Sequence, residues 1–180
     1  MAEIRNKIGL PVPPGFVITA SAYREFMKHN DLKTEINLRI QAAGEENLDS
    51  LTGVSAEIQQ LIIQAPLPEG IENAILDAFS QLEQELGNKN VKVSVRSSAL
   101  GEDVAGTTFA GQFRSILNVG RDAVIQAYKE VIASKYGLPA VTYRLSRGIP
   151  HEEVAMCVGC MAMVDAAAGG VMYSRNPLNI

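Results

Sequence analysis

The residues from Val95 to Phe113, VRSSALGEDVAGTTFAGQF, have the composition of a phosphate-binding segment. They include one arginine, three glycines and four hydroxyl side chains, and no histidine, cysteine or lysine. Glycines let backbone N–H groups approach phosphate oxygens closely, hydroxyls add donors, and a guanidinium clamps two oxygens with a permanent charge. Because proteins mainly position and neutralise phosphates during phosphoryl transfer, the missing nucleophile does not exclude this chemistry.

Composition alone leaves a second interpretation of this segment open. It matches neither the GxxxxGK[ST] phosphate loop nor the GxGxxG fingerprint. Segments rich in glycine and threonine between strands are commonly plain turns. From residue types alone, the segment is therefore either a nucleotide-binding loop or a turn.

An alternating pattern places the arginine on a strand. In VKVSVRSSA, residues 91–99, valines alternate with a lysine, a serine and Arg96. A period of two is typical of a half-buried strand, so Arg96 should project from the face opposite the valines. We expect residues 101–113 to form a loop and residues 114–119, RSILNV, to return as the next strand.

The rest of the chain predicts a helical scaffold and further strands. Apolar residues recur at helical spacing, and prolines and glycines separate the segments. The predicted helices are residues 20–30 behind a Thr19 or Ser21 cap, 34–48, 55–65 behind a Ser55 cap, 69–86 ended by Gly87, and 122–137. Residues 142–150, TYRLSRGIP, are predicted as a loop, and the other predicted strands are 16–19, 152–164 and 169–177. These elements predict an α+β fold with a mainly antiparallel sheet.

Length and charge narrow the class of protein. A chain of 180 residues is typical of one domain, and its net charge of -4 argues against a surface that neutralises nucleic-acid phosphates. The sequence shows no apolar leader with a cleavage site, and no uninterrupted apolar run of about 20 residues. We therefore expect one domain in the cytoplasm, with no nucleic-acid partner and no membrane span.

Cysteine and histidine residues offer little support for a redox or metal site. Cys157 and Cys160 form a CxxC inside the apolar run VAMCVGCMAMV, where cysteine packs as a small core residue. Zinc needs two further ligands, and the distant His29 and His151 supply them poorly. We interpret His29 as a surface residue and His151 as part of a loop, expect neither to be the phosphoryl acceptor, and predict no metal ligand. Three methionines are also predicted as core residues: Met156, Met161 and Met163.

Four ordered segments carry a family resemblance. Residues 94–119, SVRSSALGEDVAGTTFAGQFRSILNV, resemble a VRSSA...ED...SFAGQ...LNV signature. The segments GLPVPPGFVITASAYREFM, ASKYGLPAVTYRLSRGI and VAMCVGCMAMV...GGVMYSRNP resemble an opening segment, a helix with a Y-R loop and a strand pair of the same family. That family is the phosphoenolpyruvate synthase and pyruvate phosphate dikinase family, in its N-terminal ATP-binding region. Only about residues 28–90 contain no matching motif.

The resemblance implies an ATP-grasp-like N-terminal subdomain. In this family ATP binds between two subdomains and phosphorylates a histidine on a separate swivelling domain, and pyruvate then receives the phosphoryl group at a third domain. Arg96 matches the arginine that contacts the ATP phosphates, and residues 106–112 match the mobile loop that closes over them. The FAGQ sequence is more similar to the synthases than to the dikinases. The implied site, with ATP and Mg²⁺ as cofactors and no catalytic residue, is Arg96, Ser97, Ser98, Gly106, Thr107, Thr108, Gly111 and Gln112.

The sequence also departs from the family pattern. A GGK-x-x-x-L segment with an ATP-binding lysine is expected before the proline block, and Lys7 lies too close to that block to replace it, so we interpret Lys7 as a surface charge. The family's second ATP-grasp half and its phosphohistidine and pyruvate domains have no counterpart within these 180 residues. We therefore expect residues 1–180 to be one partial domain, inactive alone, with an ATP affinity roughly a hundredfold lower. Met161 and Phe113 replace glutamines common in the family, which leaves the adenine contact open.

Several charged residues have two interpretations each. Glu102 and Asp103 either order the loop and approach magnesium, or are simply solvated. Three arginines either line the nucleotide cleft or a domain contact, or face solvent in turns: Arg144, Arg147 and Arg175.

Two other functions remain open on the sequence. The same fold is compatible with a regulatory or non-catalytic nucleotide-binding module. It is also compatible with a dikinase whose acceptor is not pyruvate, such as a glucan or an antibiotic.

Overall fold

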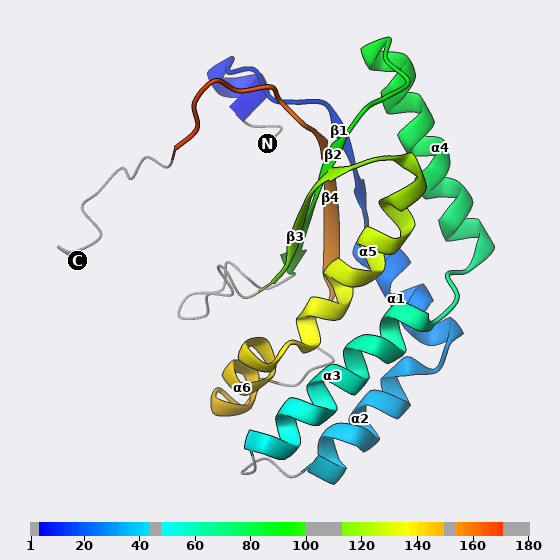
Figure 1. Ribbon diagram of the computed structural model, residues 1–180, viewed down its shortest axis with the longest axis vertical. Helices are drawn as coiled ribbons and strands as arrows, with labels where there is room; N and C mark the ends of the chain where they lie inside the picture. Colours follow the sequence, from blue (N-terminus) through cyan, green and yellow to red (C-terminus); the bar gives the residue numbers. More distant parts are fainter. Residues whose placement is uncertain (1–3, 44–47, 100–112, 150–153, 171–180) are drawn as a thin grey trace, which may run out of the picture.

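The computed structural model describes residues 4–43, 48–99, 113–149 and 154–170, and it shows an antiparallel sheet packed against helices (Figure 1). The strands of this four-stranded sheet follow the order β1-β4-β2-β3, and each neighbouring pair is antiparallel. The strands are β1 (Gly15–Ile18), β2 (Val93–Ala99), β3 (Ser115–Val119) and β4 (Met156–Ala162). The predicted α+β class and the antiparallel sheet are therefore confirmed.

Helices α1 and α4 follow the predicted segments closely, whereas α3 begins seven residues earlier than predicted and α6 was not predicted. The α-helices are α1 (Ala20–His29), α2 (Leu32–Ala43), α3 (Leu48–Gln64), α4 (Glu69–Leu86), α5 (Val124–Ala133) and α6 (Leu138–Ser146). Short helical segments are η1 (Ile4–Ile8), η2 (Arg121–Ala123) and η3 (Ser134–Tyr136). In the part of the chain that the structure describes, no helix has both the length and the apolar character needed to cross a bilayer.

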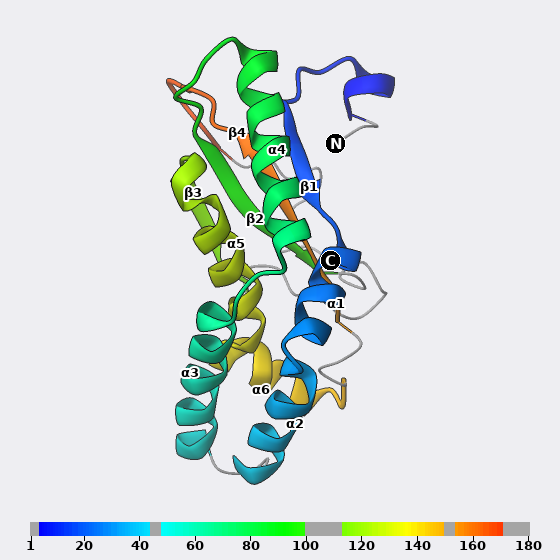
Figure 2. The same cartoon turned by 90° about the vertical axis from the view of Figure 1, so that its right-hand side faces the viewer.

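Helices cover one face of the sheet. Figures 1 and 2 show α4 and α5 along this face, and α1, α4 and α5 all contact strands. The remaining helices α2, α3 and α6 extend beyond the end of the sheet and pack mainly on other helices. Among the described residues, no helix lies over the opposite face of the sheet, which we call the open face. Side chains on the covered face form the core, including the fully buried Val93, Val95 and Val158.

Capping and apolar spacing explain the helices nearest the sheet. The Thr19 side chain accepts a hydrogen bond from the Ala22 backbone N–H, so Thr19 is the N-cap of α1. In α4 a buried stripe at helical spacing faces the sheet, and its Phe79 ring meets the Phe16 ring of β1 edge to face with centroids 6.4 Å apart. The helix ends at Gly87, whose φ of +62° is left-handed.

Replacing Gly87 with alanine should lower the free energy of unfolding by about 1 kcal/mol, because a Cβ disfavours left-handed backbone. Nothing lies within 4 Å of that Cβ, so the cost comes from the backbone alone. Urea denaturation of Gly87→Ala and of Gly70→Ala, at an open position inside the same helix, provides the comparison. Equal stability of Gly87→Ala and the unmodified chain would contradict this explanation.

Three local predictions are wrong. Residues 142–146 lie in α6, not in a loop, because the helix starts with a proline in its first turn and buries Val141 and Arg144. Helix α3 starts at Leu48, so Ser55 is no cap; it is buried inside the helix, and its hydroxyl donates to the Tyr136 carbonyl at 2.6 Å. Met163 lies beyond the end of β4 and is 37% exposed, unlike the buried Met156.

Candidate functional site

Arg96 lies on β2 in the interior of the sheet. Its pairing partners are Gly159 on β4 and Ser115 on β3. The Arg96 side chain is exposed on the open face, whereas Val93 and Val95 are fully buried on the covered face. The predicted alternation along this strand is therefore confirmed.

The same alternation separates the two serines that follow Arg96. Ser98 shares the open face with Arg96, and Ser97, which pairs with the buried Val158, lies on the other face. The other predicted site residues lie outside the described residues: Gly106, Thr107, Thr108, Gly111 and Gln112. Of the predicted site, the structure thus brings together Arg96 and Ser98. Their role in phosphate binding remains a prediction.

The described residues on both sides of residues 100–112 are anchored close to Arg96. Strands β2 and β3 are direct antiparallel neighbours, so the last residues of β2 and the first residues of β3 lie at the same end of the sheet. Phe113 packs against the core, and the Arg114 backbone N–H donates to the Ser134 hydroxyl at 2.9 Å. That hydroxyl donates in turn to the Val131 carbonyl at 2.6 Å. The described residues that flank the predicted phosphate-binding segment therefore lie near Arg96.

The open face around Arg96 combines one cation with small and apolar residues. Pairing across the sheet places Val17, Gly159, Arg96 and Ser115 in one row. Val17 is 62% exposed, and Gly159, the pairing partner of Arg96 on β4, has no side chain. A flat, apolar surface next to a guanidinium can hold a phosphate group together with an adjoining ring.

Met161 lies on this open face as well, two residues along β4 from Gly159. It is half-buried and pairs with Gly15 on one side and Ser94 on the other. The Ser94 hydroxyl donates to the Met161 carbonyl at 3.4 Å. The position is thus compatible with contact to a ligand on the open face, but a contact to adenine remains a prediction.

The CxxC sequence lies on a strand, which separates its two thiols. Cys160 is buried on the covered face and Cys157 is half-buried on the open face, because residues three apart on a strand point in opposite directions. Burial raises the pKa of Cys160 to about 12, so this thiol stays protonated and unreactive. Both cysteines are free, and the prediction of a core role is confirmed for Cys160. Within the described ranges, no three His, Cys, Asp or Glu side chains gather to hold a metal ion.

Arg144 neither lines a cleft nor faces solvent. It is fully buried on α6, where its guanidinium donates to the Lys135 carbonyl at 2.5 Å and lies 5.8 Å from the centre of the Tyr136 ring. Burial lowers the pKa of Arg144 to about 10, so it is still charged near neutral pH. Both interpretations from sequence are therefore wrong, and Arg144 is a structural residue that joins α6 to η3.

Of the other charged residues discussed from the sequence, some are described by the structure and some are not. Lys7, His29 and Arg147 are exposed, and Arg147 places its guanidinium 5.6 Å from the centre of the Tyr143 ring. Four residues lie outside the described residues: Glu102, Asp103, His151 and Arg175. Of the predicted strand 169–177, only the first two residues are described, and they are not in a strand.

Comparisons with known proteins agree with the resemblance seen in the motifs. A family model for the pyruvate phosphate dikinase AMP/ATP-binding domain matches residues 1–180. The chain is 37% identical over 172 residues to a probable phosphoenolpyruvate synthase of Methanocaldococcus jannaschii, covering 95% of this chain and 14% of that protein. It is 38% identical to the phosphoenolpyruvate synthases of Neisseria meningitidis, over 169 residues, and Escherichia coli, over 170. These matches cover 92% and 93% of this chain and 21% of each synthase, so the chain spans only a minor part of these relatives.

Proposed function

We propose, on the premise that the chain belongs to the family of pyruvate phosphate dikinase AMP/ATP-binding domains, that it is the ATP-binding portion of a phosphoenolpyruvate synthase-like phosphotransferase. The observation that carries this proposal is the exposed Arg96 on the open face of the sheet, beside the anchored ends of the glycine- and threonine-containing segment. Arg96 would clamp the ATP phosphates, with Ser98 as the neighbouring donor on that face.

The chemistry proposed for this surface is positioning and charge neutralisation. In the complete reaction, ATP, pyruvate and water would give phosphoenolpyruvate, AMP and phosphate through a phosphohistidine on another domain. The guanidinium of Arg96 would neutralise phosphate charge, and it needs no proton transfer for this role. Magnesium enters the proposal as the ion that accompanies ATP, and we assign it no ligand in this chain. Because we assign no catalytic residue here, we propose that these 180 residues alone bind ATP without turnover.

Titration calorimetry of Mg-ATP into the chain and into Arg96→Ala tests the proposal. Loss of a charged phosphate contact should weaken binding by about 2 kcal/mol, or roughly thirtyfold. Arg147→Ala is the matched control, because Arg147 is also exposed but follows the end of α6 instead of lying on the sheet. It removes the same charge and should change ATP affinity by less than twofold.

Two results would count against the proposed site. If Arg96→Ala binds ATP as tightly as the unmodified chain, the phosphates do not contact Arg96. If both arginine variants lose the same affinity, the effect is one of net charge and not of a local contact.

A further inference from the structure

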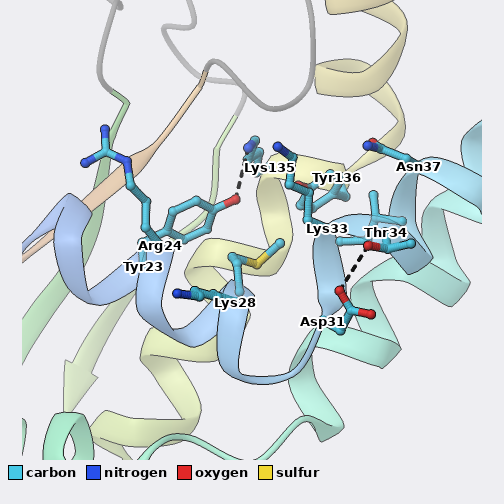
Figure 3. Close-up of a pocket in the computed structure, with 11 residues that line it drawn as sticks. Tyr23, Arg24, Lys28, Asp31, Lys33, Thr34, Asn37, Lys135 and Tyr136 are labelled. Carbon is cyan, nitrogen blue, oxygen red and sulfur yellow. Dashed lines mark hydrogen bonds between the residues drawn. The ribbon is translucent and has the colours of Figure 1, made fainter.

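A second surface feature lies away from the open face, between the first two α-helices and η3. It is a pocket of about 380 Å³ formed by α1, the turn that follows it, α2 and η3 (Figure 3). Of the residues predicted to bind ATP, the three that the structure describes, Arg96, Ser97 and Ser98, do not line it. Its volume is within the range of small-molecule sites, which starts at about 300 Å³.

Positive charge is concentrated in this pocket. Arg24 and Lys28 come from α1, Lys33 from α2 and Lys135 from η3. The chain as a whole carries a net charge of -4, so four cations with one carboxylate at a single pocket oppose the average charge of the surface. A concentrated field of one sign raises the local concentration of ligands of the opposite charge.

Among the described residues that line the pocket, Asp31 is the only acidic one, and it already has a partner. The Thr34 hydroxyl donates to the Asp31 carboxylate at 3.0 Å, and the Asp31 carbonyl accepts from the Glu35 backbone N–H. Asp31 therefore accepts hydrogen bonds from the first turn of α2. Within the described part of the chain, no ion pair joins Arg24 or Lys28 to a carboxylate. Two of the four cations thus remain available to an incoming anion.

The inner wall of the pocket is buried and partly aromatic. Lys135 is only 1% exposed, and its ammonium donates to the Tyr23 hydroxyl at 3.0 Å. The same ammonium lies 5.1 Å from the ring centres of Tyr23 and Tyr136. In Figure 3 the nitrogen-bearing ends of Lys33, Lys135 and Asn37 lie along one side of the pocket. Cationic ends beside aromatic and aliphatic surface suit a ligand that is anionic at one end and apolar at the other.

We propose that this pocket binds a small organic phosphate, with Lys28 and Arg24 contacting the phosphate and the Tyr23, Tyr136 and Met27 side chains contacting the organic part. Phosphate fits better than a carboxylate because it offers oxygens in three dimensions, and can contact the two cations of α1 together with Lys33 of α2. Neither Arg96 nor Ser98 lines this pocket, so the proposal concerns a second site.

The test is an NMR titration of the isotope-labelled chain with phenyl phosphate and, separately, with inorganic phosphate. We expect phenyl phosphate to shift amide signals of residues 23–37 and 135–136, and to bind more tightly than inorganic phosphate. Lys28→Ala should weaken phenyl phosphate binding about tenfold, as for the loss of one charge-assisted contact. Lys89→Ala removes the same charge from an exposed turn outside the pocket and should have less than a twofold effect.

Several outcomes would overturn this proposal. They are the absence of shifts at the pocket, equal affinity for the two probes, and equal weakening by Lys28→Ala and Lys89→Ala. Arg96→Ala separates the two sites, because it should leave phenyl phosphate binding unchanged. If Arg96→Ala abolishes that binding, the probe occupies the proposed ATP site and not this pocket.

Discussion

Replacing Arg144 with alanine is expected to lower the free energy of unfolding by about 3–5 kcal/mol. The substitution leaves a cavity where a fully buried side chain stood, and it removes the donor to the Lys135 carbonyl. It also removes the contact between the guanidinium and the Tyr136 ring. Urea denaturation followed by circular dichroism measures the difference between the two chains.

Arg144→Met separates the contribution of volume from that of charge. Methionine fills most of the space, and it removes a cation that burial already disfavours, since burial lowers the pKa of Arg144. We expect Arg144→Met to lower the free energy of unfolding by about 1–2 kcal/mol, chiefly because the Lys135 carbonyl loses its donor. Loss of less than 1 kcal/mol in Arg144→Ala would show that this packing contributes little to stability.

A single methyl group at Gly15 is expected to destabilise the chain by about 3 kcal/mol. Gly15 pairs with Met161, and a Cβ at Gly15 would lie 2.2 Å from the Cys160 carbonyl oxygen and 2.9 Å from the Met161 Cα. Both are backbone atoms, so no side-chain rotation relieves the overlap. Strand β1 must move away from β4, and Phe16 then loses its contact with Phe79.

Gly53→Ala is the matched control for Gly15→Ala. Gly53 is exposed inside α3, and nothing lies within 4 Å of its added Cβ. Alanine in a helix interior should raise the free energy of unfolding by about 0.5–1 kcal/mol. Unfolding curves of the two variants should therefore move in opposite directions. A shift of Gly15→Ala toward higher stability would mean that β1 does not approach β4 as closely as described.

Hydrophobic periodicity, together with the prolines and glycines that end elements, was sufficient to predict most of the helices and strands. The valines of β2 alternate with polar residues because the strand has one covered and one open face, so the orientation of Arg96 was predictable. Helix α4 was predictable because its apolar stripe ends at a left-handed glycine, Gly87. Both signals are local, and each depends on fewer than about 20 consecutive residues.

The wrong predictions concern features that tertiary contacts decide. Arg144 was assigned to a loop because arginine and threonine near Gly148 resemble a turn, yet burial against Tyr136 holds this segment as a helix. Likewise, Ser55 has the chemistry of a helix cap, and only its long-range bond to the Tyr136 carbonyl shows another role. The basic pocket was missed for the same reason, since η3 brings Lys135 to two helices far away in sequence.

The order of strands has a consequence for how the chain folds. The sheet order β1-β4-β2-β3 places the last of its strands in the chain between the first two. During synthesis β2 and β3 can pair as a local hairpin, but β1 has no neighbour until residues 156–162 have left the ribosome. Such non-local pairing raises contact order and slows folding, and it leaves the edge of β1 exposed in nascent chains. Chains truncated before residue 156 should therefore need chaperone assistance or aggregate, because β1 then lacks its partner strand β4.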